Sequence, residues 1–313
     1  MLDILVITAP IYLCMLAGYV LTRGGLFTRA GIDALGTFVM YVAMPAVIFL
    51  SMSSRRLADV AHPTYLVAYA VTSLLALGVG YVWSRRVNRT PRAAAAFDGM
   101  GSGGANSGFV GFPLLLVVLP SVAGGVFGMN VIVESLVTIP LCLFLAERGN
   151  AGGGLWMSVR PALVAMAKMP VLLAMAAGLL ASASGLVLPD VLRTSVDLLG
   201  RASTGLALFT VGGMLVGLSV RGRLGRVLAV SVGKLFLMPA VAFGVGLGLV
   251  SLGLPALEGD LFAALVLSAA MPAWTSLSVF AARYGDNDVP PAVLLVTTAT
   301  SFLTLSGLLA VLT

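Results

Sequence analysis

Long apolar stretches follow one another along almost the whole chain. A helix that crosses the hydrocarbon core of a bilayer needs about 20 mostly apolar residues. Ten stretches meet this requirement, at 4–22, 32–51, 63–83, 97–119, 124–146, 161–182, 194–218, 225–251, 259–282 and 289–312. Stretches such as 65–77 and 235–250 are apolar on all sides and do not alternate with polar residues, which favours helices over membrane strands. The pattern predicts an all-α integral membrane protein with ten transmembrane helices and no soluble domain of useful size.

The composition excludes several classes of protein. Of the 313 residues, 59% are hydrophobic and 10% are charged, whereas soluble domains carry about 25% charged residues. An ordinary soluble enzyme and a disordered chain are therefore excluded. The two cysteines, Cys14 and Cys142, lie inside apolar stretches and form neither a disulfide framework nor a metal-binding spacing. With His62 as the single histidine, we expect no metal site, no cofactor and no enzymatic activity.

Lysine and arginine residues are distributed unevenly between the predicted loops. The loops after odd-numbered spans contain twelve of them, and the loops after even-numbered spans contain three. Because basic loops stay in the cytoplasm, we expect both termini outside and a location in the cytoplasmic (inner) membrane. The net charge of +6 is then a property of membrane topology, and no nucleic-acid partner is expected. The span at 4–22 lacks a basic segment before it and is expected to be a retained helix and not a signal peptide.

A glycine-rich hydrophilic segment at 147–160 divides the chain near its middle. We interpret it as a cytoplasmic linker between a first five-helix repeat at 1–146 and a second at 161–313. An odd number of spans in each half forces the two halves into opposite orientations, which is the inverted-repeat arrangement of many secondary transporters.

The fourth and ninth spans, at the same ordinal position in each half, contain residues that interrupt a helix. The fourth includes a glycine-rich stretch from Gly101 to Pro113, and the ninth includes polar residues and a proline between Ser268 and Ser278. Unwound backbone persists inside a bilayer only where it is buried in protein or lines a cavity. The N-termini of half-helices suit anionic groups. Two such breaks that face each other at the bilayer midplane would form a substrate site without any catalytic side chain.

Other glycines and prolines in the spans have simpler interpretations. Glycines commonly permit close packing of membrane helices, and prolines kink them. We assign helix packing to Gly78, Gly80, Gly244, Gly246 and Gly248, and simple kinks to Pro45, Pro140 and Pro239.

The residues at the two breaks resemble the signatures of the auxin efflux carrier family, which includes the plant PIN carriers and many bacterial organic-acid permeases. The fourth span has Asn106-Ser107 followed by Gly111-Phe112-Pro113-Leu114, and the ninth has Pro272 followed by Phe280-Ala281 and Tyr284. Met44-Pro45, Met169-Pro170 and the stretch from Leu199 to Phe209 add matches, so the resemblance covers essentially the whole chain. One departure is Gly205, which stands where relatives often have proline.

This resemblance implies two inverted five-helix repeats with broken crossover helices four and nine, and transport of small carboxylates such as malonate, malate or auxin-like acids. Asn106 is then expected to hydrogen-bond the substrate carboxylate. Trp274 either covers the apolar part of the substrate or packs beside the break. The full set of expected substrate-binding residues is Asn106, Ser107, Gly108, Pro113, Pro272, Trp274, Thr275 and Ser276.

Ionisable residues inside the spans are candidates for ion coupling, because charge near the bilayer centre is costly. Glu134 lies among apolar neighbours, and burial disfavours the charged form of a carboxyl group, so we expect it to exchange a proton or to be held by a hydrogen bond. Lys234 either extends its ammonium to the interface or offers a cation to the substrate or to Glu134. Asp98 joins the proton-coupling candidates, although a helix N-terminal charge is an alternative. Asp197 and Arg201 lie four residues apart and should pair.

The sequence therefore predicts a secondary active transporter that moves a small organic anion through the lipid bilayer by alternating access, coupled to protons. The alternatives are a sodium-coupled symporter that resembles bile-acid carriers, and a membrane sensor of the same fold that does not transport. A channel is disfavoured because no ring of filter residues or polar stripe is visible. The particular carboxylate, the direction of transport and a homodimeric assembly are left open.

Overall fold

A computed structural model of the chain describes residues 2–53, 62–147, 164, 167–186, 188–220, 224–251, 253–257 and 259–312. Nearly all of the predicted linker and the first part of the sixth predicted span lie outside these residues. Helix is the main secondary structure of the described residues, and an isolated antiparallel β-bridge joins Ala105 to Ala273. Helix occupies part or all of each of the ten predicted spans.

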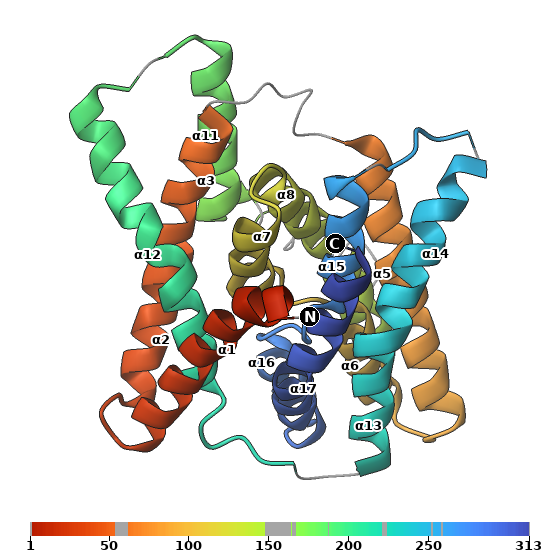
Figure 1. Cartoon of the computed structure of the whole chain (residues 1–313). Coiled ribbons are helices and arrows are strands. Elements are labelled where there is room, and N and C mark those ends of the chain that lie inside the picture. Colours follow the sequence, from red (N-terminus) through yellow and green to blue (C-terminus); the bar gives the residue numbers. More distant parts are fainter. Residues whose placement is uncertain are drawn as a thin grey trace. The chain divides into compact units, whose positions relative to one another are not determined.

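The helices follow one another along the chain as shown in Figure 1. They are α1 (Leu2–Arg23), α2 (Arg29–Phe38), α3 (Met44–Ser53), α5 (Pro63–Arg86), α6 (Arg92–Gly103), α7 (Phe112–Val118), α8 (Ala123–Val133), α9 (Ile139–Glu147), α11 (Pro170–Ala183), α12 (Asp190–Met214), α13 (Leu224–Val232), α14 (Met238–Ser251), α15 (Asp260–Ala270), α16 (Leu277–Ala282) and α17 (Val289–Leu312). In the part of the chain that the structure describes, four π-helices interrupt them, namely η1 (Val39–Ala43), η2 (Ser107–Gly111), η3 (Glu134–Thr138) and η4 (Gly233–Leu237).

Continuous helical segments of membrane-spanning length and apolarity number five within the described part of the chain. They are Arg29–Ser53, Pro63–Arg86, Ala123–Glu147, Leu224–Ser251 and Val289–Val311. Their length and composition agree with the prediction of an all-α integral membrane protein.

Each of the π-helices η1 to η4 begins six residues before a proline. The pairs are Val39 with Pro45, Ser107 with Pro113, Glu134 with Pro140, and Gly233 with Pro239. Proline lacks the N–H group of an α-helical hydrogen bond, and its ring clashes with the carbonyl four residues earlier, so the turn before it widens. Helix α12, which has Gly205 and no internal proline, is α-helical throughout, whereas α1 stays α-helical around Pro10.

The contacts divide the chain into two compact units. Unit 1 comprises Met1–His62, Gly108–Met129 and Ala165–Val216, and unit 2 comprises Pro63–Ser107, Asn130–Val164 and Gly217–Thr313. Each unit draws residues from both halves of the sequence. The relation of 1–146 to 161–313 as inverted repeats stays a prediction.

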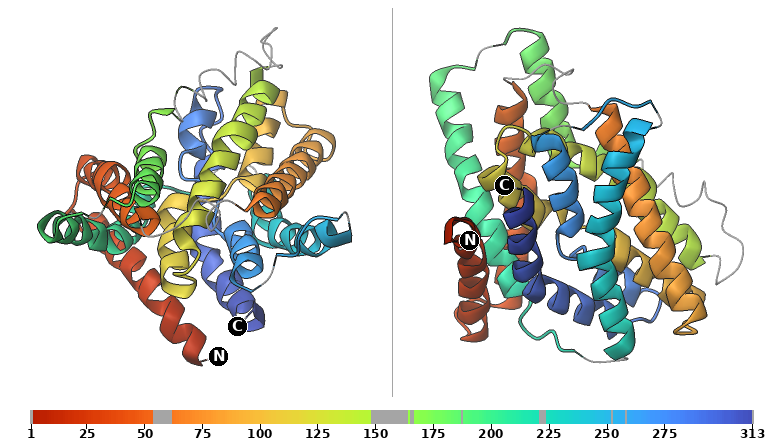
Figure 2. Two further views of the ribbon diagram at one scale, coloured as in Figure 1. Left: turned by 90° about the horizontal axis from the view of Figure 1, so that it is seen from above. Right: turned by 45° about the vertical axis from the view of Figure 1, so that its right-hand side comes forward.

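In unit 1, α1 packs along α12 (Figure 2), and glycines permit the close approach. A Cβ atom at Gly212 would lie 1.8 Å from the carbonyl oxygen of Met15, and one at Gly18 would lie 2.0 Å from the carbonyl oxygen of Phe209. Only residues without a side chain allow two backbones to meet in this way.

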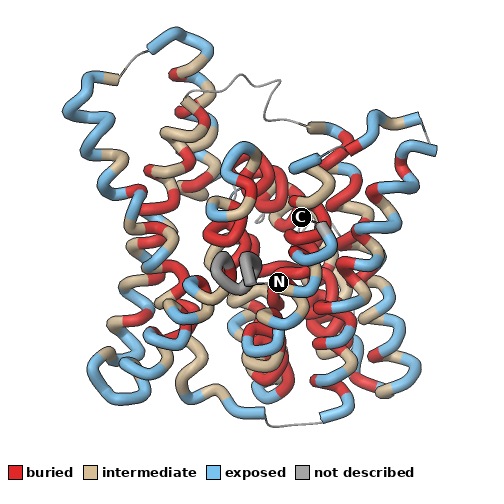
Figure 3. The backbone as a smooth tube through the Cα atoms, viewed as in Figure 1, coloured by how far each residue is buried: buried red, intermediate tan, exposed pale blue. Residues whose placement is uncertain are grey.

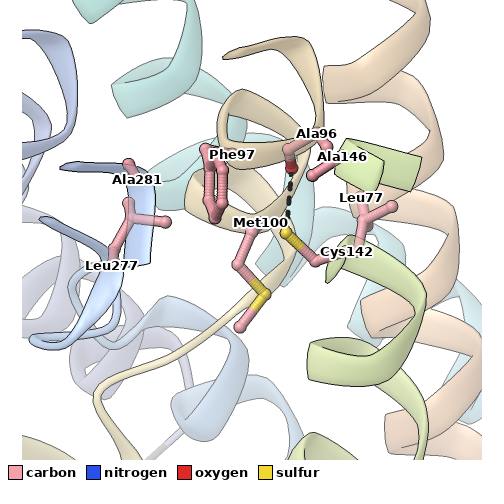
Figure 4. Close-up of a cluster of buried hydrophobic side chains, with 8 residues drawn as sticks. All are labelled: Leu77, Ala96, Phe97, Met100, Cys142, Ala146, Leu277 and Ala281. Atoms are coloured by element: carbon pink, nitrogen blue, oxygen red, sulfur yellow. Dashed lines mark hydrogen bonds between the residues drawn. The ribbon is translucent and has the colours of Figure 1, made fainter. Parts of the chain in front are cut away.

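In unit 2, α6 packs closely against α5 and is buried along most of its length (Figure 3). A Cβ atom at Gly103 would lie 2.6 Å from the carbonyl oxygen of Ser73 on α5. Phe97 and Met100 of α6 contribute to a core with residues of α5, α9 and α16, where Cys142 donates to the carbonyl of Ala96 (Figure 4). This packing fixes the helix that leads into the first break.

Candidate functional site

The fourth and ninth spans both break, as predicted, and the two breaks meet within unit 2. Helix α6 ends at Gly103 and helical structure resumes at Ser107, while α15 ends at Ala270 and α16 begins at Leu277. The extended segments pair through the β-bridge between Ala105 and Ala273. The backbone N–H of Asn106 donates to the carbonyl of Pro272 at 2.9 Å. We call these two non-helical segments, 104–106 and 271–276, the crossing.

Local sequence explains why the helices stop where they do. Pro272 disfavours helical backbone at the residue before it, and Met271 is extended with φ −59° and ψ 152°. The N–H of Ala273, freed from the helix, donates to the Thr297 hydroxyl of α17 at 3.2 Å. Thr297 in turn donates to the carbonyl of Val293 at 2.7 Å. Buried backbone groups at the break thus find partners, as buried polar groups must.

The first break is narrower than the sequence indicated. The predicted interruption began at Gly101, but Gly101 and Gly103 are helical. A Cβ atom at Gly101 would lie 2.7 Å from the Val230 side chain, so these glycines serve packing. The backbone becomes extended at Gly104, with φ −102° and ψ 137°.

Most of the predicted substrate-binding residues lie at the crossing. Asn106 and Ser107 are buried, and Pro272 contributes the carbonyl of the bridge. The Thr275 hydroxyl is buried and has no hydrogen-bond partner within the described residues. Ser276 precedes α16 as its N-cap residue without a capping side-chain hydrogen bond.

Three other residues of the predicted set have different surroundings. The Trp274 ring packs against Phe280, with ring centroids 5.2 Å apart, which agrees with its packing alternative. Gly108 and Pro113 belong to unit 1, on η2 and α7.

Glu134 is hydrogen-bonded to the start of the second half of the broken fourth span. The Ser107 hydroxyl donates to Glu134 Oε1 at 2.5 Å, and the Tyr69 hydroxyl donates to the same atom at 2.8 Å. The residue is 8% exposed. A carboxyl group held by two hydroxyls in this way can exist with or without a proton, since hydroxyls donate to the charged form and accept from the neutral one.

A neighbouring polar cluster was not singled out from the sequence. The Tyr65 hydroxyl donates to Asn130 Oδ1 at 3.0 Å, and Asn130 Nδ2 donates to the Ser268 hydroxyl at 3.0 Å. Asn130 and Glu134 lie four residues apart along one helical segment, and Tyr65 and Tyr69 have the same spacing on α5. An asparagine inside an apolar span was the signal that could have identified this cluster.

Lys234 does not extend its ammonium to the interface. Its residue is 0% exposed, and its Nζ donates to the carbonyl oxygen of Ala269 at 2.9 Å. It also lies 2.7 Å from the sulfur of Met238. Ala269 is in the last turn of α15, where helix carbonyls carry partial negative charge. Lys234 and Glu134 interact electrostatically.

Asp98 belongs to a separate ion-pair cluster of unit 2. The helix α6 extends back to Arg92 through a run of alanines, so Asp98 is in the middle of the helix and not at its N-terminus as the alternative required. Arg226 Nε donates to Asp98 Oδ2 at 2.6 Å, and Arg226 also pairs with Asp286. The Ser84 hydroxyl is a further donor to Asp98.

The predicted surface pair is confirmed, since Arg201 Nε lies 2.7 Å from Asp197 Oδ2. Among the described residues, no group of three His, Cys, Asp or Glu side chains could hold a metal ion.

Apolar helices of membrane-spanning length, together with two broken spans that meet at buried polar groups, define an integral membrane protein of the transporter class. The chain belongs to the membrane transport protein family, whose profile matches residues 3–153 and 155–309. This family is that of the auxin efflux carriers, so the resemblance seen in the sequence is confirmed.

Relatives with assigned names are transporters. "Uncharacterized transporter YfdV" of Escherichia coli (strain K12) is 26% identical over 206 residues, which cover 65% of this chain and 66% of that protein, just under two thirds of its length. "Putative malonate transporter" of Rhizobium meliloti (strain 1021) is 25% identical over 316 residues, which cover 99% of this chain and 96% of that protein. The chain thus belongs to a family of membrane transport proteins.

Proposed function

We propose that this protein is a secondary active transporter that carries a small organic anion with a carboxylate group across the cytoplasmic membrane by alternating access. The observation that carries this proposal is the bridge between Ala105 and Ala273, which brings two unwound segments together inside unit 2. Unwound backbone at such a place suits a substrate site because its N–H and C=O groups are no longer all used within a helix.

Each part of the crossing has a proposed role. Asn106 hydrogen-bonds the substrate carboxylate. Thr275 and Ser276 add hydroxyl donors, and the unpartnered Thr275 hydroxyl supports this role. Trp274 covers the apolar part of the substrate while it packs on Phe280. Ser107, Gly108, Pro113 and Pro272 shape the backbone around the site.

Glu134 is the proposed proton-coupling residue. Its carboxyl group is buried and contacts Ser107, the residue directly after Asn106. Binding of a substrate anion beside it favours the protonated form, because two adjacent negative charges repel in a site of low dielectric. Asp98 is left out of this role because Arg226 already neutralises its carboxylate.

The topology is part of the same proposal. Ten transmembrane spans, arranged as two inverted five-helix repeats with both termini outside, account for the helices and for the distribution of basic residues. The name of the Rhizobium meliloti relative, matched over 99% of this chain, supports a small carboxylate such as malonate as substrate.

A thermal-shift screen of the detergent-purified protein tests the proposal. Malonate, malate and indole-3-acetate are added with and without sodium, and the matched amides malonamide and indole-3-acetamide serve as controls for carboxylate recognition. A ligand at a hundred times its dissociation constant stabilises the folded state by about 2.7 kcal/mol.

We expect at least one carboxylate to raise the melting temperature without sodium, and its amide to have no effect. Equal shifts with acid and amide, or no shift with any carboxylate, contradict the proposed substrate class. A shift that requires sodium favours a sodium-coupled symporter that resembles bile-acid carriers.

A further inference from the structure

Two ionisable side chains of opposite sign are buried beside the crossing, and each is hydrogen-bonded to one of the two broken spans. Glu134 accepts a hydrogen bond from Ser107, where η2 begins, and Lys234 donates to the carbonyl of Ala269, one residue before α15 ends. Both side chains belong to unit 2. No direct ion pair joins them within the residues that the structure describes, yet they interact electrostatically.

The charges on the elements packed around this pair belong to a separate ion-pair cluster or lie toward helix ends. Helix α5 contributes the hydroxyls of Tyr65 and Tyr69. Helix α6 contributes Asp98, which shares Arg226 of α13 with Asp286, so that this cluster holds two carboxylates and one guanidinium. The remaining ionisable groups of these elements lie toward helix ends or serve the core: Tyr81, Arg85 and Arg86 on α5, Arg92 on α6, Cys142 and Glu147 on α9, and Asp260 at the start of α15. The sequences of α14 and α17 contain no ionisable side chain.

Charge balance then restricts what can bind. A net charge buried in a membrane protein is costly, whereas a pair of opposite charges is much less so. With Lys234 as an ammonium and Glu134 as a carboxylate, the empty site is neutral. A bound carboxylate monoanion adds one negative charge. Neutrality returns when the Glu134 carboxylate takes up one proton and becomes a carboxylic acid.

We propose that the site binds one proton for each carboxylate monoanion, so that the site is neutral both empty and loaded and transport moves no net charge. Lys234 is the fixed counter-cation in both states. A dicarboxylate such as malonate is bound as its singly charged hydrogen form, because a dianion would leave one negative charge without a partner. This inference rests on the proposed function and adds the charge state of the substrate and the stoichiometry of coupling.

The position of Lys234 also bears on the coupling ion. Its ammonium already occupies the carbonyl end of α15 at Ala269, where helix carbonyls would otherwise attract a small cation. The Lys234 ammonium, which is covalently part of the protein, therefore takes the place that a bound sodium ion would occupy. We accordingly expect transport that does not depend on sodium.

Calorimetry of binding in two buffers with different ionisation enthalpies counts the protons taken up. Indole-3-acetate, a monoanion at neutral pH, should take up one proton for each molecule bound. Malonate, which is a dianion at that pH, should take up two, one on Glu134 and one on the ligand. Glu134→Gln should lower each count by one, whereas Glu147→Gln, at the other end of the same helical segment, should leave both counts unchanged.

Uptake into proteoliposomes at a membrane potential set by potassium and valinomycin tests the charge balance. Wild-type uptake of indole-3-acetate and malonate should follow an imposed pH gradient, should change less than about twofold with potential, and should need no sodium. Glu134→Gln carries the indole-3-acetate anion without a proton, so its uptake of this ligand should ignore the pH gradient and increase with a positive interior. Its uptake of malonate should keep only the pH dependence that comes from the proton on the hydrogen malonate ligand. Lys234→Met should lose proton-coupled uptake at least tenfold, and the exposed Lys168→Met should retain it.

The outcomes separate this inference from the proposed function. Wild-type uptake that follows pH but also changes strongly with potential overturns charge neutrality and leaves the proposed carrier intact. An unchanged proton count in Glu134→Gln overturns the role of Glu134, and unchanged uptake in Lys234→Met overturns that of Lys234. Absence of any carboxylate binding overturns both proposals. The Glu134→Gln results decide the question even if Lys234→Met does not fold.

Discussion

At the scale of single residues, hydroxyl groups from helices distant in sequence hold the crossing together. Thr297 of α17 accepts the N–H of Ala273, and Ser107 and Tyr69 both donate to Glu134. These groups satisfy backbone and carboxyl atoms that would otherwise be buried without partners, at a cost of about 1–3 kcal/mol each. The crossing therefore depends on a small number of hydroxyls that carry no charge.

Thr297→Val keeps the shape of the side chain but removes the acceptor for the Ala273 N–H. We expect it to lower the free energy of unfolding by about 1–3 kcal/mol and to weaken carboxylate binding, both read from thermal-shift titrations. Thr300→Val, three residues further along α17 with an exposed hydroxyl bonded to Val296, is the matched control and should change neither. Equal effects of the two variants would show that the hydrogen bond between Thr297 and the Ala273 N–H does not stabilise the crossing.

Asn106→Ala tests the proposed contact with the substrate. A lost hydrogen bond to a charged group is worth about 1.5–3 kcal/mol, so the affinity for carboxylate should fall about ten- to a hundredfold while the protein stays folded. Binding is measured by calorimetry, with Asn88→Ala in the loop before α6 as control. Unchanged affinity in Asn106→Ala would remove the substrate site from the crossing.

At the scale of helical elements, the positions of the breaks were predictable and their partners were not. Glycine, asparagine and proline in the fourth and ninth spans disfavour helix locally, so one sequence is enough to detect the interruption. Packing decided its width, because Gly101 and Gly103 permit close contact of helices and stay helical. The contact of Lys234 with Ala269 joins residues from different spans, and no local pattern in a single sequence indicates such a pair.

The π-helices give a second prediction at this scale. Pro239→Ala restores an N–H, so η4 should tighten into α-helix. Each residue of an α-helix advances by about 100°, so Lys234 would turn away from Ala269. We expect the stranded charge to cost about 3–5 kcal/mol of unfolding free energy, measured by denaturation in detergent.

Two further variants show whether the loss of stability comes from the displacement of Lys234 or from the loss of a proline alone. Pro45→Ala changes η1, which contains no acidic or basic side chain, and should have a much smaller effect. Adding Lys234→Met to Pro239→Ala should recover part of the lost stability, because it removes the stranded charge. Equal costs for Pro239→Ala and Pro45→Ala, without recovery in the double variant, would show that η4 does not position Lys234.

At the scale of the whole molecule, each compact unit combines segments from both halves of the chain. Unit 2 contains both breaks, Glu134 and Lys234, so the proposed binding and coupling residues other than Gly108 and Pro113 belong to one unit. A site and its counter-charges within a single unit can keep their mutual geometry during a conformational change. This property is what proton coupling at the site requires.

Topology is tested by cysteine labelling of intact cells, in a variant whose Cys14 and Cys142 are replaced by serine. The distribution of basic residues places position 188 outside and position 88 in the cytoplasm. A membrane-impermeant maleimide should label cysteine at 188 and should label cysteine at 88 only after permeabilisation. The reverse pattern would overturn the orientation with both termini outside.

Accumulation of radiolabelled malonate in proteoliposomes is the most direct test of the central claim, that the crossing carries a carboxylate together with a proton. With an acidic exterior and no sodium, the wild-type protein should concentrate malonate above its external level, and a protonophore should abolish the gradient. Asn106→Ala should fail to accumulate it, and Glu134→Gln should accumulate it to a lower level, because only the proton on the hydrogen malonate ligand then enters with it. Binding without accumulation would identify a sensor, and accumulation at the wild-type level in both variants would contradict the assignment of the site.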